Sequence, residues 1–171
     1  MDEVVLGKGK KLLLMGSKAY TDHKLPKVVK QLLNAAIKEQ MQIIVGEAPG
    51  ACHLYQDYLH SQGYRDVIVG HARSLRYNAG DWLDMKYGDV LAERERNMIE
   101  ACDSAIIIWV NQSSQIAANL ERLKWLGKPT FLYECSSFSD EKRFGPIDLN
   151  RVYQPFLYQK LRAKYGKPLI H

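Results

Sequence analysis

The sequence lacks any hydrophobic run long enough to cross a membrane. Its longest uninterrupted apolar string, residues 105–110, has the length of a strand, whereas a membrane helix needs about 20 residues. Cysteine is also scarce: Cys52, Cys102 and Cys135 lie far apart and never form a CxxC pair, which argues against a disulfide framework or a zinc site. The first 16 residues show no small-residue cleavage pattern. We therefore expect a cytoplasmic protein with no membrane segment and no metal.

The excess of positive over negative charge is also small. The chain has 24 Lys and Arg against 19 Asp and Glu, and residues 140–171 carry seven of the basic residues but only three of the acidic ones. Most of the net charge of +5 therefore belongs to this C-terminal segment. Dispersed positive charge with acidic neighbours is a weak indication of nucleic-acid binding. With 171 residues, 46% of them hydrophobic, the chain has the size and composition of one globular domain.

Short apolar runs alternate with segments of helical period along most of the chain. The clearest helix places apolar residues from Leu25 to Ile37 at i, i+3, i+4 and i+7, with Pro26 in its first turn. Further helices are expected near residues 51–63, 91–102 and 114–126, and strands at residues 11–16, 42–46, 66–70, 104–110 and 129–133. Continuous apolar strands of this kind are typical of a parallel sheet covered on both faces. We predict a doubly wound, Rossmann-like α/β domain of about five strands, with its core at residues 11–135.

Two segments fall outside this repeat. Residues 71–90 show no helical or strand periodicity, and we expect a long functional or mobile loop. Its Tyr77 or Trp82 could stack on a base, or could pack in the core or against a partner. Residues 136–171 begin with a polar patch, followed by apolar residues spaced by four from Tyr153 to Tyr165. This spacing predicts a helical extension of the same domain that packs against the sheet edge or a partner.

The carboxyl ends of parallel strands meet at one edge of a sheet, where ligands bind. Two turns of small residues are expected there. The first strand runs into Gly16, Ser17 and Lys18, which could hold a phosphate, and the second into Gly46, Glu47, Ala48, Pro49, Gly50 and Ala51. Either turn alone could be an ordinary strand-to-helix connection. Neither is a Walker loop or a GxGxxG motif, so we expect no NAD, FAD or other cofactor.

Other polar residues are predicted at the same edge. Arg96 would pair with an anionic group through its planar fork and Asn97 could hydrogen bond the ligand, although alternating charges in a helix often form a solvated face. His71, at the end of the third strand, is a weaker candidate because a lone histidine is usually structural. The polar turn after the fourth strand either contacts the ligand or caps the next helix; its candidate residues are Asn111, Ser113 and Ser114.

Four motifs in order, GSKAYTD, GEAPGA, RERNMIEACDSAIIIW and GKPTFLYE, resemble the SLOG superfamily, nearest to its YspA, cpYpsA-related branch. The resemblance covers roughly residues 11–135. It implies a Rossmann-like fold related to lonely-guy phosphoribohydrolases and DprA, a nucleotide-derived ligand at the carboxyl edge of the sheet, and often a homodimer. Some relatives cleave N-glycosidic bonds. The positions that match the family's binding pattern are Ser17, Lys18, Gly46, Glu47, Gly50, Arg96 and Asn97.

The departures from the family bear on catalysis. The PGGxGTxxE motif of lonely-guy enzymes is replaced by NQSSQIAANLERL. The resemblance to the more distant deoxyribosyltransferases implies that their catalytic glutamate would fall close to Asn119, which cannot act as a carboxylate nucleophile. Glu121 lies about 200° further round the helix. Glu47 and Glu93 are then the candidate catalytic carboxylates, and the alternative for Glu47 is a surface substitution without a catalytic role.

Three functional hypotheses follow from these residues. The leading one is binding of a nucleotide or ribose-phosphate derivative. The alternative is an N-glycoside hydrolase or transferase acting on a nucleoside or its monophosphate. The third is a nucleic-acid-binding or interaction module.

Overall fold

A computed structural model describes residues 10–168 of the chain. Its strands form a single sheet in the order β4-β3-β2-β1-β5-β6-β7. All neighbouring strands are parallel except β6 and β7. This confirms the predicted α/β class, and the predicted parallel sheet carries one antiparallel strand at its edge. The strand bounds are β1 Lys11–Gly16, β2 Gln42–Val45, β3 Val67–His71, β4 Leu83–Lys86, β5 Ser104–Val110, β6 Thr130–Cys135 and β7 Lys142–Pro146.

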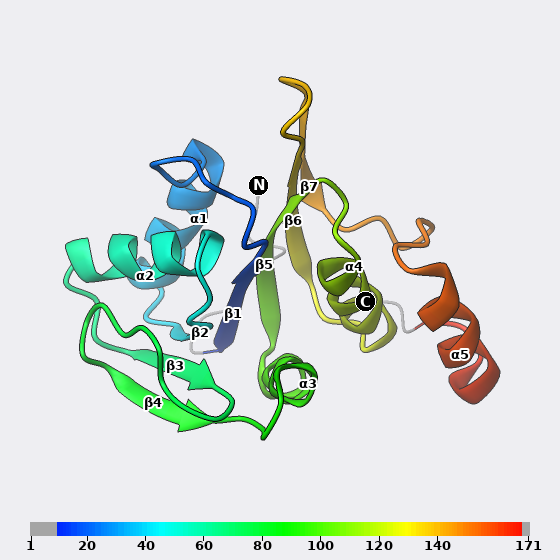
Figure 1. Cartoon of the computed structure of the whole chain (residues 1–171), viewed down its shortest axis with the longest axis horizontal. Coiled ribbons are helices and arrows are strands. Elements are labelled where there is room, and N and C mark those ends of the chain that lie inside the picture. Colours follow the sequence, from blue (N-terminus) through cyan, green and yellow to red (C-terminus); the bar gives the residue numbers. More distant parts are fainter. Residues whose placement is uncertain (1–9, 169–171) are drawn as a thin grey trace.

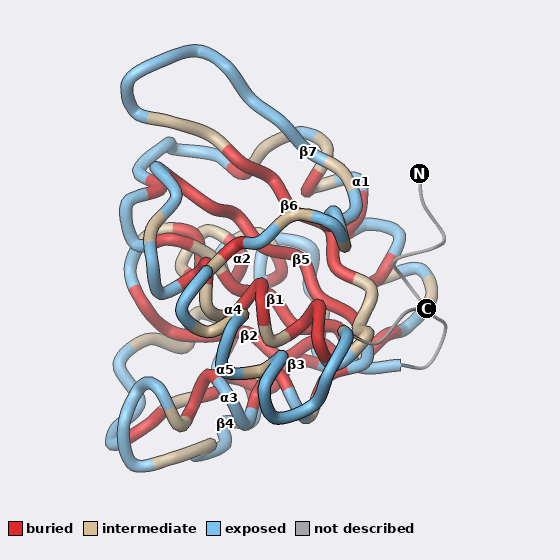
Figure 2. Tube along the Cα trace, turned by 90° about the vertical axis from the view of Figure 1, so that its right-hand side faces the viewer, coloured by how far each residue is buried: buried red, intermediate tan, exposed pale blue. Residues whose placement is uncertain are grey.

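Helices cover both faces of this sheet (Figure 1). Their bounds are α1 Lys27–Lys38, α2 Ala51–Ser61, α3 Leu91–Ala101, α4 Ser114–Trp125 and α5 Pro155–Tyr165. Successive strand residues point to opposite faces, so Leu12 and Leu14 of β1 belong to the core beneath α1 and α2, whereas Leu13 and Met15 belong to the core beneath α3 and α4. Both faces of the central strands are buried (Figure 2). This two-sided burial explains why their sequences are continuously apolar.

The prediction of about five strands was too low, because β4 and β7 had not been recognised. Within the segment expected to be a loop, Leu83–Lys86 pairs in parallel with β3. All four of its residues are exposed, so β4 has no apolar run that could mark it in the sequence. The residue before this strand is anchored: Trp82 is 4% exposed and its indole N–H donates to the Tyr64 carbonyl over 2.8 Å. Trp82 is therefore a core residue.

The C-terminal extension adds the antiparallel strand β7 and the helix α5. A buried ion pair within α4, in which Glu121 Oε1 lies 2.5 Å from Lys124 Nζ, binds the backbone of the extension. The other oxygen of Glu121 accepts the backbone N–H of Tyr153 over 2.8 Å, and Lys124 donates to the carbonyl of Arg151 over 2.8 Å. The extension therefore packs beside α4 (Figure 1). Among residues 10–168, no helix has both the length and the hydropathy that a membrane span requires.

Candidate functional site

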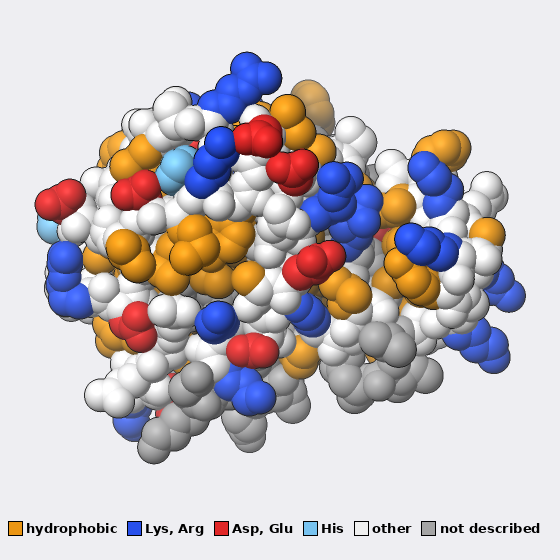
Figure 3. Space-filling view, turned by 90° about the horizontal axis from the view of Figure 1, so that it is seen from below, with side chains coloured by type: hydrophobic (Ala, Val, Ile, Leu, Met, Phe, Trp, Pro, Cys, Tyr) orange, Lys and Arg blue, Asp and Glu red, His pale blue; other side chains and the backbone are white. Residues whose placement is uncertain are grey.

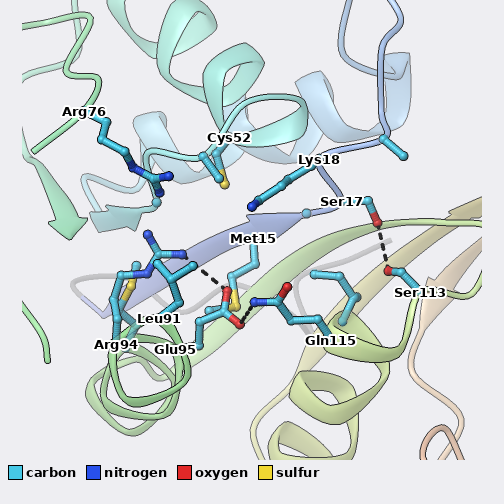
Figure 4. Close-up of a pocket in the computed structure, with 16 residues that line it drawn as sticks. Met15, Ser17, Lys18, Cys52, Arg76, Leu91, Arg94, Glu95, Ser113 and Gln115 are labelled. Carbon is cyan, nitrogen blue, oxygen red and sulfur yellow. Dashed lines mark hydrogen bonds and ion pairs between the residues drawn. The ribbon is translucent and has the colours of Figure 1, made fainter. Parts of the chain in front are cut away.

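A cavity of about 230 Å³ opens at the carboxyl ends of the central strands. It is lined by the turn after β1 and by the first turns of α2, α3 and α4 (Figure 4). Of the predicted ligand-binding residues, it includes Gly16, Ser17, Lys18, Gly46 and Ser113. The cavity therefore brings together turns that lie about a hundred residues apart in the chain.

The two small-residue turns are packed directly against each other. The backbone N–H of Ala51 donates to the Ser17 carbonyl over 3.2 Å. Gly50 has φ +85°, and a Cβ there would lie 2.5 Å from the Lys18 carbonyl oxygen. A Cβ at Gly16 would lie 2.4 Å from the Cβ of Ala51. These glycines therefore allow the close approach of the two turns that forms one wall of the cavity.

Ser17 joins this wall to the turn after β5. Its side chain is buried, accepts the backbone N–H of Val110 over 2.9 Å and lies 3.4 Å from the Ser113 hydroxyl. Ser113 occupies the N-cap position of α4 but makes no side-chain cap hydrogen bond. The Ser113 hydroxyl points to Ser17 instead. Ser113 therefore does not cap the first backbone N–H groups of α4, which lie at the cavity.

The N-terminal ends of three helices reach this cavity. The N-cap residues of α2, α3 and α4 are Gly50, Val90 and Ser113, and none makes a side-chain cap hydrogen bond. Leu91 and Gln115, from the first turns of α3 and α4, line the cavity. The first N–H group of α2, that of Ala51, is paired with the Ser17 carbonyl, but the positive ends of the three helix dipoles still favour an anion at such a place.

Arg94 is the most informative residue of the site. It is 5% exposed, and its Nη1 lies 3.7 Å from Glu47 Oε2, which is beyond hydrogen-bond distance. Its Nη2 lies 3.5 Å from Glu95 Oε2. Nε and Nη1 have no hydrogen-bond partner among the residues that the structure describes. Glu47 and Glu95 offset part of the charge of this guanidinium, but a buried polar group without a hydrogen-bond partner costs free energy, so Nε and Nη1 retain the capacity to donate to an anion.

Glu47 holds the two arginines of the site in place. Its side chain is 1% exposed. Oε2 accepts Nε of Arg76 over 2.7 Å, and Oε1 accepts the backbone N–H of Arg76. The carboxylate is thus engaged by Arg76 and faces Arg94, and it is not a free nucleophile.

Glu95 is the carboxylate that lines the cavity itself. Its Oε1 accepts Nε2 of Gln115 over 2.9 Å and Nδ2 of Asn119 over 3.1 Å. Figure 4 shows Arg94 and Glu95 reaching up from α3, with Lys18 on the opposite wall. Asn119 therefore lies close to a carboxylate after all, but the carboxylate comes from a different helix.

The cavity also contains the thiol of Cys52. Burial raises its pKa to about 11. Since the thiolate is the reactive form, this cysteine is a packing residue at neutral pH.

Several predicted residues lie outside the cavity. Arg96 and Asn97 are exposed, and Asn97 donates to the Tyr87 carbonyl. Glu93 accepts the backbone N–H of Asp89 over 2.8 Å at the start of α3. His71 pairs with Asp84, with Nε2 2.8 Å from Oδ2.

Of the candidate residues in the polar turn after β5, some lie at the cavity and others lie outside it. Asn111 exchanges hydrogen bonds with Ser137, and Ser114 is exposed at the start of α4. Only Ser113 of the three turn candidates reaches the cavity.

The sequence interpretation missed Arg94, Glu95, Arg76 and Gln115. A signal for the first two was present, because residues 91, 94, 95 and 98 form one helical stripe. Met98 of this stripe is buried. Arg96 and Asn97 project from the other side of α3. Applying the helical period to charged as well as apolar residues would have selected Arg94 over Arg96.

Comparisons with protein-family models, with curated proteins and with solved structures find no match to this chain.

Proposed function

We propose that this protein binds a nucleotide or a nucleotide-derived ligand, with its ribose-phosphate part in the cavity between β1, β2 and β5. The observation that carries the proposal is Arg94: a buried guanidinium with two nitrogen atoms that lack hydrogen-bond partners among the described residues lines the cavity. Lys18 and Arg76 add positive charge, so that three basic side chains stand against the two carboxylates of Glu47 and Glu95, and three helix N-termini converge on the same space. A phosphate would make charge-assisted hydrogen bonds with these groups.

The volume supports a sugar phosphate in the cavity. At about 230 Å³ it is below the roughly 300 Å³ at which ligand pockets usually begin. A second hollow, of about 510 Å³, shares Arg76 and Leu91 with the first cavity. The base would then extend past these residues. The resemblance to the SLOG superfamily agrees with this class of ligand.

Glu95 supports a second candidate, cleavage of an N-glycosidic bond. It lines the cavity beside Asn119, whereas Glu93 lies outside and Glu47 is bound to Arg76. However, its carboxylate oxygens already face three side-chain donors, from Gln115, Asn119 and Arg94. This arrangement favours a role in orienting Arg94, and binding remains the preferred function.

The experiment is calorimetric titration of the protein with ribose 5-phosphate and with the common nucleoside monophosphates. In Arg94→Met, binding should weaken at least about tenfold, because a hydrogen bond to a charged group contributes about 1.5–3 kcal/mol. Arg94→Lys should recover part of the affinity. Arg143→Met, on the exposed strand β7, is the matched control and should bind like the wild type.

Equal affinity of Arg94→Met and wild type would refute the proposed site. Mass spectrometry of the same mixtures distinguishes the second candidate. Release of free base that is lost in Glu95→Gln would establish cleavage, and intact ligand would exclude it.

A further inference from the structure

A separate cavity of about 430 Å³, distinct from the two spaces described above, lies between α3, α4 and α5. It is formed by the C-terminal halves of α3 and α4, so it is at the opposite end of these helices from the cavity of Arg94. Its apolar lining includes Ile99, Trp125 and Leu161. The two cavities share no lining residue. The inference drawn below is therefore independent of the proposed nucleotide site.

The charges around this cavity are unbalanced. Arg96, Arg122 and Lys167 line it, against one carboxylate, Glu100. None of the three basic side chains makes an ion pair or a side-chain hydrogen bond with a residue in the described range 10–168. On the face shown in Figure 3, Lys and Arg side chains gather beside hydrophobic ones between the core and α5. The cavity therefore combines an apolar lining with a surplus of two positive charges.

The two arginines lie close enough to affect each other. Burial, and then the positive charge of Arg96, lower the pKa of the Arg122 guanidinium. An anion between them would relieve this repulsion and could accept hydrogen bonds from both forks. The apolar residues beside them would at the same time cover a hydrophobic group of the ligand.

We propose that this cavity binds a small amphipathic anion, with an apolar body against Trp125 and Leu161 and a carboxylate or phosphate head between Arg96 and Arg122. A volume of about 430 Å³ is within the range of roughly 300–1,000 Å³ found for small-molecule pockets. A role of this kind also accounts for Arg96, which does not reach the other cavity. It also accounts for Lys167 of the basic C-terminal segment, whose positive charge would attract the anion.

Calorimetric titration with four probes tests the proposal. Octanoate and octyl phosphate have both an apolar body and an anionic head, octanamide has no charge, and acetate has no apolar body. Octanoate or octyl phosphate should bind at least about tenfold more tightly than octanamide and acetate. The tighter of the two identifies the head group that the site prefers.

Variants locate the binding. The double variant Arg96→Gln/Arg122→Gln should weaken binding at least about tenfold, and Leu161→Gln should weaken it as well. The matched control Lys160→Gln/Lys164→Gln removes two positive charges from α5 at residues outside the cavity, and it should bind like the wild type. Thermal unfolding verifies that each variant is folded.

Three results would overturn the proposal. They are no binding of either amphipathic probe, equal binding of octanamide, and unchanged binding by the double arginine variant. Loss of binding in Arg94→Met would also overturn it, because the anion would then occupy the first cavity. Retention of binding in Arg94→Met would support two separate sites, whatever the outcome for nucleotides.

Discussion

Replacing Gly50 with alanine should damage both the fold and the candidate site. Gly50 has φ +85° and ψ −129°, a backbone conformation that residues with a side chain adopt at a cost of about 1–3 kcal/mol. The new Cβ would lie 2.5 Å from the Lys18 carbonyl oxygen and 2.6 Å from that of Ser17. Both neighbours are backbone atoms, so the turn after β1 would have to move.

The magnitude follows from these two effects. Moving the turn would break the hydrogen bond from Ala51 to Ser17, which contributes about 0.5–1.5 kcal/mol. Together with the conformational cost, the free energy of unfolding should fall by about 3 kcal/mol. For a protein of this size that corresponds to a decrease in melting temperature of roughly 6–12 °C.

Gly63→Ala is the matched control. Gly63 also has a positive φ, +68°, but a Cβ there would meet no atom within 4 Å. This change should cost only about 1 kcal/mol. Urea unfolding of both variants, analysed by linear extrapolation, measures the difference, and calorimetry with nucleoside monophosphates should show weaker binding for Gly50→Ala alone. If the two variants lost the same stability, the close packing of the two turns would not explain why glycine is needed at position 50.

Two further predictions concern buried carboxylates of the C-terminal half. Glu121→Ala leaves a lysine without its partner in the interior, so urea unfolding should show a loss of about 3–5 kcal/mol. Glu141→Ala, in an exposed pair, should change stability by less than about 1 kcal/mol, and equal losses would contradict this reasoning. The hydrogen bond from Arg151 holds the pKa of Glu134 below its ordinary value of 4.5. The stability that this ionised carboxylate contributes is complete above pH 4.5 and is lost as the pH falls through the lowered pKa. The difference in unfolding free energy between wild type and Glu134→Gln should therefore be constant from pH 7 to about 5 and shrink below pH 4.5, and a difference that grew at low pH would refute the assignment.

Most of the sheet could be predicted because burial imposes a pattern on the residues. Strands β1, β2, β3, β5 and β6 are covered on both faces, so each appears in the sequence as a short continuous apolar run between turns. Strands β4 and β7 lie at the two edges of the sheet. Their exposed residues alternate or mix without an apolar run, and only pairing with β3 and β6 makes them strands.

The candidate site was predictable only in part. The turns that end β1 and β2 were expected at one edge of the sheet because parallel topology brings the carboxyl ends of strands together. Side chains on the following helices were harder to assign. Arg94 and Arg96 are both arginines on the same helix, and two residues of separation turn them about 200° apart, so that one is buried in the cavity and the other faces α5.

The sequence by itself therefore determined the alternation of buried strands and amphipathic helices and the position of two glycine-rich turns, since these depend on local period and backbone freedom. The tertiary structure alone decided which charged groups meet. Glu47, Arg76, Arg94 and Glu95 come from three separate segments. Their interactions depend on the distances and burial that arise only when the helices pack on the sheet. The same packing leaves Arg94 with unused hydrogen-bonding capacity, and this is the feature from which a ligand can be inferred.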